Sequence, residues 1–291
     1  MQLIEEFEQS LVENGIASKT IESYVGDVRG FCAFLFGMGV SDPTDLKRFY
    51  VVSYKNHLVE QNYAIATINK KINSLQAFNL FLIEQGMAKE MAVTLRKDRI
   101  KVAAGSEGEV EVFSEQEVSQ LLFFTQDESK VSLRNRLIVW LLLYTGVRVS
   151  ELCGIQLRDF DYLTNILRVT GKGGKYREIP LRSDLVDLIK DYVRTERQHS
   201  RFSDSTFLLV SQRAGKLHKD AVNTMLEGLK KRLGFRMYPH KFRHTFCTRL
   251  LTKGVPITTV SKLAGHAHIQ TTASFYINTS RQDKEQAVAL L

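Results

Sequence analysis

Several features that define particular protein classes are scarce in this chain of 291 residues. Proline occurs only 4 times and glycine 18 times, which excludes collagen-like and low-complexity sequences. The three cysteines, Cys32, Cys153 and Cys247, are far apart and form no CxxC pair, which argues against a disulfide framework or a thiolate zinc site. The longest apolar run, residues 137–144, is much shorter than the ~20 residues that span a bilayer. The first residues, MQLIEE, lack the basic start and apolar core of a signal peptide, so we expect a soluble, cytoplasmic protein with no membrane partner.

Positive charge is concentrated in one part of the chain. Lysine and arginine number 40 against 32 aspartates and glutamates, which gives a net charge of +8. Residues 1–100 sum to −1 and residues 101–112 to −2, so residues 113–291 carry +11. A region this basic is typical of a protein with a polyanionic partner, most often nucleic acid, although a charge that serves only solubility remains open.

The periodicity of apolar residues divides the chain in two. The segment RKDRIKVAAGSEGEVE, residues 96–111, interrupts the helical pattern and is rich in small and polar residues, which indicates a linker. We therefore predict a helical domain over residues 1–96, a linker over 97–112 and a second domain over 113–291. The first domain shows helical spacing without strand patterns, and we expect about four helices, one of them opening at Asp42-Pro43.

The second domain is predicted to be mainly α with a small antiparallel β-sheet. Ser114 and Glu117 form a capping-box pattern at its start, and a strongly apolar helix follows over 133–144 and ends near Gly146. Two strand patterns, 166–169 and 176–179, flank the glycine-rich turn GKGGK. Further helices are expected to begin near residues 184, 219, 240, 257, 270 and 280.

Several polar residues stand where a purely structural sequence has no need of them. Arg148, in TGVRVSEL, follows the apolar helix directly and must reach solvent or pair with an anion. In PHKFRHTF, His240, Arg243 and His244 share one face of a helix at its N-terminus. Free backbone N–H groups and the helix dipole add to the side-chain charge there, so this segment predicts an anion site.

A metal site is the alternative for the two histidines at positions i and i+4. Zinc-binding helices of this kind need a third ligand and often place a glutamate beside the first histidine. Here that position holds Lys241, and a cation beside a metal is unfavourable. The chain also lacks the carboxylate cluster of two-metal nucleases, so we expect no metal.

The motifs fall in the order seen in one family. They are Arg148 in TGVRVSEL, Lys172 in GKGGK, His240 and Arg243 in PHKFRHTF, His266 in LAGH and Tyr276 in TTASFYIN. In this order they resemble the motifs of the tyrosine recombinases, also called the phage integrase family, and most closely those of its Xer-type branch. The resemblance extends over nearly the whole chain. The resemblance implies a helical, SAM-like core-binding domain followed by a catalytic domain. One departure is that Tyr276 follows His266 by ten residues, where the Xer-type pattern has nine.

The resemblance also implies a reaction. The phenol oxygen of Tyr276 attacks a DNA phosphodiester, a 3′-phosphotyrosyl bond forms and a 5′-hydroxyl leaves; reversal by another strand exchanges strands through a Holliday junction. No metal, ATP or other cofactor takes part. The implied roles are phosphate binding by Arg148 and Arg243, a hydrogen bond from His266, proton acceptance by His240 and protonation of the leaving oxygen by Lys172.

Two of these roles have alternatives. Lys175, three residues after Lys172, could serve as the acid instead, although the family pattern favours the lysine of GKG. Glu151 stands one helical turn after Arg148 and either orients it or is an ordinary helix carboxylate.

Partners follow from the same resemblance. The expected partner is a double-stranded DNA recombination site bound by a homotetramer. The apolar tail of residues 280–291 would dock on a neighbouring protomer, or alternatively pack on its own domain. Basic and hydroxyl residues on predicted helices favour further DNA contacts, with solvated faces as the alternative. These candidates are Lys19, Thr20, Tyr24, Lys70, Lys71, Ser74 and, on the hairpin, Lys175.

Two other functions stay open at this point. A type IB topoisomerase uses a similar set of side chains to relax DNA without exchanging partners. A non-catalytic DNA-binding protein on this fold would have lost at least one catalytic position, and all six are present here.

Overall fold

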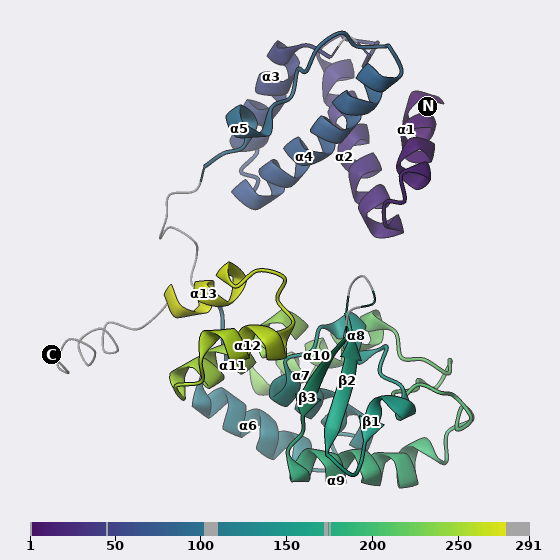
Figure 1. The fold of residues 1–291 in the computed structure, drawn as a ribbon, viewed down its shortest axis with the longest axis vertical. Coiled ribbons are helices and arrows are strands. Elements are labelled where there is room, and N and C mark those ends of the chain that lie inside the picture. The colour runs from purple at the N-terminus through teal and green to yellow at the C-terminus, as the bar shows by residue number, and fades with distance from the viewer. Residues whose placement is uncertain (1, 45, 102–109, 172–173, 175, 278–291) are drawn as a thin grey trace, which may run out of the picture. The chain divides into compact units, whose positions relative to one another are not determined.

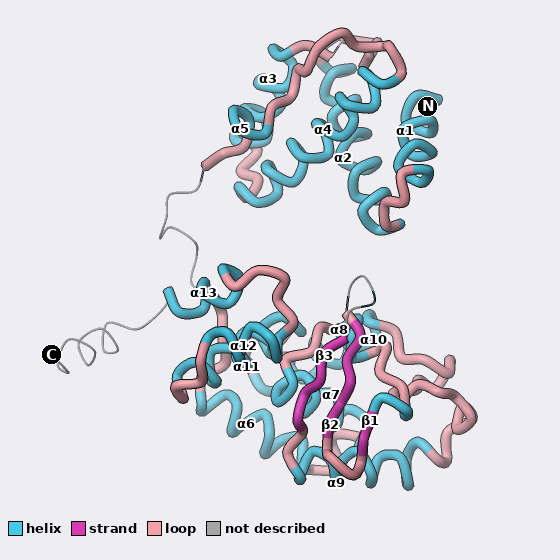
Figure 2. Tube along the Cα trace, viewed as in Figure 1, coloured by secondary structure: helices cyan, strands magenta, loops and turns pink. Residues whose placement is uncertain are grey.

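The computed structural model describes residues 2–44, 46–101, 110–171, 174 and 176–277, with the side chains of all but residues 274–277. Contacts divide the chain into two units, residues 1–107 and 108–291. Both are mainly helical, and a small antiparallel sheet lies in the second, as predicted (Figure 2). Of the helices described, none has the length and apolar character needed to cross a membrane.

The first unit is built on four helices and a short fifth one. They are α1 (Gln2–Glu13), α2 (Ser18–Gly37), α3 (Arg48–Glu60), α4 (Ile65–Glu84) and α5 (Leu95–Asp98). Their apolar faces form one core, in which the rings of Phe7, Phe78 and Phe81 lie within 6.2 Å of one another. The spacing of apolar residues therefore produces helices that bury one face each.

The third helix begins later than the sequence indicated. We expected it to open at Asp42-Pro43, but α3 begins at Arg48. The Oδ1 atom of Asp42 accepts hydrogen bonds from the N–H and hydroxyl of Thr44, 2.9 and 2.7 Å away. This local turn competes with a helical backbone, which explains the difference.

Packing of the first unit continues beyond residue 96, where the linker was expected to begin. The carboxylate of Asp98 is buried, pairs with Arg48 and accepts from the N–H of Thr94. Asn69 of α4 exchanges two hydrogen bonds with the backbone of Ile100. These contacts attach residues 97–100 to the helical core.

The second unit surrounds one buried helix with further helices and the sheet (Figure 1). Its helices are α6 (Glu115–Gln126), α7 (Leu133–Thr145), α8 (Val149–Leu152), α9 (Ser183–Tyr192) with a π-helical extension (Val193–Arg197), α10 (Lys219–Leu233), α11 (Pro239–Thr252), α12 (Ile257–Ala264) and α13 (Gln270–Ile277). Every residue of α7 from Leu137 to Leu143 is buried. The oxygen of Ser132 caps the start of α7, and Gly146, in the left-handed conformation, ends it.

The sheet has the order β1-β2-β3 and is antiparallel throughout. Its strands are β1 (Phe160–Asp161), β2 (Ile166–Thr170) and β3 (Tyr176–Pro180). Leu167, Val169 and Ile179 face the core around α7. The two-residue β1 was not predicted, because it is too short to show an alternating pattern. On the other side of β3, the helices α11, α12 and α13 pack together (Figure 1).

Candidate active site

Four of the six predicted catalytic side chains come together around the end of α7. Arg148 is the N-cap residue of α8, His240 and Arg243 lie in the first turns of α11, and His266 follows the end of α12. Arg148 and Arg243 both lower the pKa of His240 and of His266, so all four lie within electrostatic range of one another. Segments separated by up to 118 positions in the chain thus form one cationic cluster.

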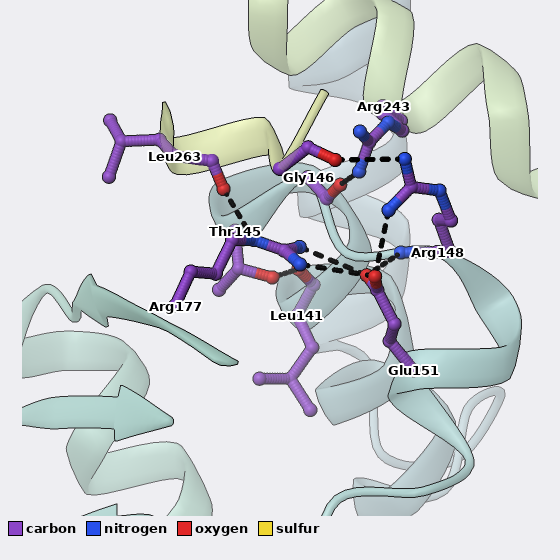
Figure 3. A network of polar contacts seen from close by, with 9 residues as sticks. Leu141, Thr145, Gly146, Arg148, Glu151, Arg177, Arg243 and Leu263 are labelled. Atoms are coloured by element: carbon purple, nitrogen blue, oxygen red, sulfur yellow. Dashed lines mark hydrogen bonds and ion pairs between the residues drawn. The ribbon is translucent and has the colours of Figure 1, made fainter. Parts of the chain in front are cut away.

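Arg243 is the most deeply placed charge of the cluster, with a relative exposure of 4%. Its Nη1 donates to the carbonyl oxygen of Gly146 at 2.7 Å, while its buried Nη2 has no hydrogen-bond partner among the described residues (Figure 3). Burial, and then the charge of Arg148, lower its pKa to about 10. A buried guanidinium with an unpaired N–H beside a second guanidinium favours an anion.

Gly146 allows the close approach that holds Arg243. Its φ is +60°, and a Cβ atom there would lie 2.4 Å from the ring of Phe246 on α11. The absence of a side chain lets the end of α7 pack against α11, with the Gly146 carbonyl facing the guanidinium. The glycine of TGVR is therefore needed for both backbone conformation and packing.

Arg148 is held by its own helix and by a distant turn. Its backbone N–H and its Nη1 both donate to the carboxylate of Glu151, each at 2.8 Å. Its Nη2 donates to the carbonyl oxygen of Gly265 at 3.0 Å. The side chain of Arg148 remains 37% exposed, so it stays accessible to a ligand. Glu151 was expected either to orient Arg148 or to be an ordinary helix carboxylate, and these hydrogen bonds support the first alternative.

The histidines of the cluster are kept neutral. Burial and the charges of Arg243 and Arg148 lower the pKa of His240 below its usual 6.5. The same causes, in the same order, lower the pKa of His266 to about 4. The Nδ1 atom of His266 lies 2.7 Å from the hydroxyl of Thr272 on α13, which orients the ring. Neutral imidazoles can accept a proton or donate a hydrogen bond without adding charge to the site.

The other two predicted catalytic groups are only partly described. Tyr276 lies in the last turn of α13, which packs on α11 and α12, and its side chain is outside the described part. Lys172 and the competing Lys175 lie outside the described residues between β2 and β3. The rings of His240 and His244 have centroids 6.1 Å apart. Among the residues described, no three His, Cys, Asp or Glu side chains form a group that could hold a metal.

Two contacts of the site were missed by the sequence analysis, those of Arg177 and Thr272. Arg177 donates to both oxygens of Glu151, at 3.1 and 2.9 Å, and to the carbonyl of Leu263 at 2.7 Å (Figure 3). The sequence did contain a signal for Arg177. In β3, Arg177 and Ile179 are two residues apart and therefore lie on the same, less exposed face of the strand. An arginine on the apolar face of a strand needs an internal anion.

The predicted DNA-binding residues of the first unit fall into two groups. Lys70, Lys71 and Ser74 of α4 gather around the buried carboxylate of Asp27: each lysine pairs with it at 3.1 Å, and the Ser74 hydroxyl donates at 2.8 Å. Ser74 is fully buried, whereas the Lys70 side chain is 52% exposed. The second group lies on α2, with Lys19 exposed and with Thr20 and Tyr24 half-buried.

Comparison with known proteins decides the family. The model of the phage integrase family matches residues 111–283, and that of its N-terminal SAM-like domain matches residues 4–86. The chain belongs to the phage integrase family. This tyrosine recombinase is 31% identical to the TnP I resolvase of Bacillus thuringiensis over the full length of both proteins. It is 33% identical to the tyrosine recombinase XerA of Pyrococcus furiosus, covering 98% of this chain and 92% of the relative.

Solved structures share the fold of this tyrosine recombinase. XerH bound to its palindromic difH substrate matches with a TM-score of 0.76 and 20% identity, over 92% of this chain and 79% of that one. A lambda integrase tetramer bound to a Holliday junction matches with a TM-score of 0.72 and 19% identity, over 96% and 78%. The family membership makes the protein a site-specific DNA recombinase that cuts and rejoins DNA strands. The topoisomerase and non-catalytic alternatives are not favoured.

Proposed function

We propose that Arg148, Arg243, His240 and His266 form the pocket for the scissile phosphate of a double-stranded recombination site. The observation that carries this is the Nη2 atom of Arg243, which is buried without a partner among the described residues, beside a second guanidinium. A phosphodiester supplies the missing acceptor and the missing negative charge. Arginine suits this role because its charge is permanent and its N–H groups bind two oxygens at once.

In the proposed reaction, the phenol oxygen of Tyr276 forms a bond to phosphorus, and the bond from phosphorus to the 5′-oxygen breaks. The phenol proton passes to His240, whose lowered pKa leaves it unprotonated near neutral pH. Lys172 supplies a proton to the leaving 5′-oxygen. The arginines and His266 stabilise charge on the non-bridging oxygens, where one preorganised donor typically contributes ~10²–10³ in rate. No metal or ATP enters this balance.

The resulting 3′-phosphotyrosyl bond conserves the energy of the phosphodiester, so a 5′-hydroxyl of another strand can reverse the step. Repetition on both strand pairs exchanges partners through a Holliday junction. We propose a homotetramer on two duplexes for this exchange. Support comes from the lambda integrase tetramer on a Holliday junction, which this chain resembles in fold.

The chain ends in the apolar residues AVALL, and the second unit offers a groove of matching character. This groove, of about 340 Å³, is lined by side chains of α7, β3, α11 and α12. They include Leu143, Ile179, Phe246, Leu250 and Leu263. We propose that it receives the tail of a neighbouring protomer. The site of action is proposed to be the cytoplasm, with the first and second units as the two DNA-binding halves, joined by the segment that follows residue 100.

Outside the pocket, we propose DNA contacts by cations of the first unit, of which Lys70 is exposed and Lys71 is mostly buried, with its side chain 16% exposed. Lys70 and Lys71 are held in fixed positions by Asp27, which suits phosphate contacts. Lys19, Thr20 and Tyr24 would contact DNA from α2, and Lys175 from the β2–β3 connection. Ser74 is committed to Asp27 and would act through the lysines rather than on DNA.

The experiment is a covalent-capture assay with the full chain. A library of short nicked duplexes with randomised cores is incubated with the protein, and DNA that stays attached under denaturing conditions is sequenced to find the cleaved site. A protein–DNA band is expected for the wild type. Tyr276→Phe should bind the same duplex but form no band, and Arg243→Ala should form it about 10²-fold or more slowly. A band of equal intensity from Tyr276→Phe would contradict the assignment.

A further inference from the structure

Arg177 connects three parts of the catalytic unit that are distant in sequence. It lies on β3, and its side chain is only 13% exposed. Its Nη1 and Nη2 donate to the carboxylate of Glu151 on α8, and its Nε donates to the carbonyl of Leu263 at the end of α12. None of the roles proposed above belongs to this residue. All three kinds of N–H on its guanidinium are nevertheless used within the site.

The contact with Glu151 determines how Arg148 is held. The carboxylate is shared by two guanidiniums, and the Arg148 side chain donates only one hydrogen bond to it, at Oε1 (Figure 3). Burial raises the pKa of Glu151, but the hydrogen bonds from Arg177 and from the Arg148 backbone outweigh it, and the net pKa is lowered. Glu151 is thus ionised, and its negative charge interacts with both Arg148 and Arg177.

The contact of Arg177 with the end of α12 helps to fix the position of His266. Gly265 has a φ of +68°, and a Cβ atom there would lie 2.8 Å from Nη1 of Arg177. The Arg177 guanidinium therefore packs directly beneath the turn that joins α12 to His266, and it also binds the Leu263 carbonyl in that turn. The neighbouring carbonyl, that of Gly265, accepts from Arg148. One side chain of β3 supports both the arginine and the histidine of the phosphate pocket.

We propose that Arg177 is a positioning residue that keeps Glu151 from competing with the scissile phosphate for Arg148. With Arg177 in place, Glu151 orients the Arg148 side chain through one bond, and the N–H groups that bind neither Glu151 nor the Gly265 carbonyl remain for the ligand. Without Arg177, the freed carboxylate turns both oxygens to Arg148, and the α12 turn loses its support. This inference rests on the proposed phosphate pocket and adds a determinant of its geometry.

The test compares Arg177→Gln with the wild type on the duplex found by covalent capture. Cleavage is measured in a single turnover at saturating protein, and the dissociation constant is measured separately on the Tyr276→Phe background. We expect the cleavage rate to fall about 10²-fold, the cost of a small misplacement of reacting groups, with the dissociation constant changed less than threefold. Arg168→Gln is the matched control: it removes an arginine from the adjacent strand β2 whose pair with Glu178 is exposed, and its rate should equal that of the wild type.

A second variant separates positioning from a general loss of structure. Glu151→Gln alone should slow cleavage, because Arg148 loses its orienting charge. In the Arg177→Gln background the same change should raise the rate, because the competing carboxylate is gone. A double variant no faster than Arg177→Gln, or an Arg177→Gln protein that cleaves like the wild type, would overturn this inference. A wild type that forms no covalent complex would instead overturn the proposed function itself.

Discussion

At the scale of single residues, Gly146 shows why one position in TGVR admits no side chain. It combines a left-handed backbone with a contact in which a Cβ atom would lie 2.4 Å from the Phe246 ring. Its carbonyl oxygen also accepts the hydrogen bond from Nη1 of Arg243, at 2.7 Å. Backbone conformation, packing and the position of Arg243 therefore depend on the same residue.

The first prediction concerns Gly146→Ala. We expect it to lower the free energy of unfolding by about 1–2 kcal/mol for the left-handed conformation and a further ~1–3 kcal/mol for displacing Phe246. Gly234→Ala is the matched control, because Gly234 has a φ of +84° and open space around its Cβ position. Urea unfolding of both variants measures the difference. Equal losses would show that Phe246 moves aside freely, contrary to the account.

The second prediction concerns the pH dependence of cleavage. Because burial, Arg243 and Arg148 lower the pKa of His240, its protonated form predominates only at pH values below 6.5. A protonated His240 cannot accept the phenol proton, so the rate should fall on the acid side with a midpoint below 6.5. The profile is measured at subsaturating DNA, which reports the free enzyme. A midpoint at or above 6.5, or an unchanged acid limb in His240→Gln, would contradict the proposed role.

At the scale of secondary-structure elements, α11 is fixed to the start of the catalytic unit by Thr245. The backbone N–H of Phe113 donates to the Thr245 hydroxyl at 2.8 Å, and that hydroxyl donates to the Lys241 carbonyl at 2.8 Å. Lys241 is itself buried, with its ammonium 4.5 Å from the centre of the Phe113 ring. These contacts hold the helix that carries His240 and Arg243.

The third prediction follows from these contacts. Thr245→Val keeps the shape but leaves the buried N–H of Phe113 without an acceptor, which should lower the free energy of unfolding by about 1–3 kcal/mol. Thr252→Val is the matched control, because the Thr252 hydroxyl makes the same kind of bond to the Thr248 carbonyl but is exposed. The control should change stability by less than ~0.5 kcal/mol. A thermal melt of both variants, in which Thr245→Val behaves like the control, would contradict this.

The elements could be predicted from sequence where local signals agree. The apolar run after Ser132 and the glycine at 146 bound α7 to within one residue of its observed end. The capping box at Ser114 and Glu117 is confirmed. Prediction failed where a local turn or a distant partner decides the outcome, as with Asp42 and with β1. Arg177 was missed because its three acceptors lie on α8 and α12, which its own neighbours in sequence do not reveal.

At the scale of the whole molecule, the order of the motifs predicted the family, and the family-model matches confirm it. Local periodicity alone could not have done so, because each predicted catalytic side chain is unremarkable in its own segment. The position of the domain boundary was less predictable. Polar composition after residue 96 indicated a linker, but Asp98 and Ile100 are tied to the first unit by long-range contacts with Arg48 and Asn69.

The fourth prediction concerns assembly. Deletion of residues 287–291 removes the apolar end proposed to dock on a neighbouring protomer. The shortened chain should bind a single DNA site with unchanged affinity but should no longer join two duplexes in a four-protein complex. Native gel electrophoresis with duplexes of two lengths measures this directly. Full assembly by the shortened chain would show that the tail packs elsewhere.

The most direct test of the central claim is to identify the amino acid and the DNA end in the covalent complex. The trapped complex is digested with a protease and a nuclease, and the modified peptide is sequenced by mass spectrometry. The account predicts a nucleotide attached through its 3′-phosphate to Tyr276. Attachment to any other side chain, or through a 5′-phosphate, would contradict it.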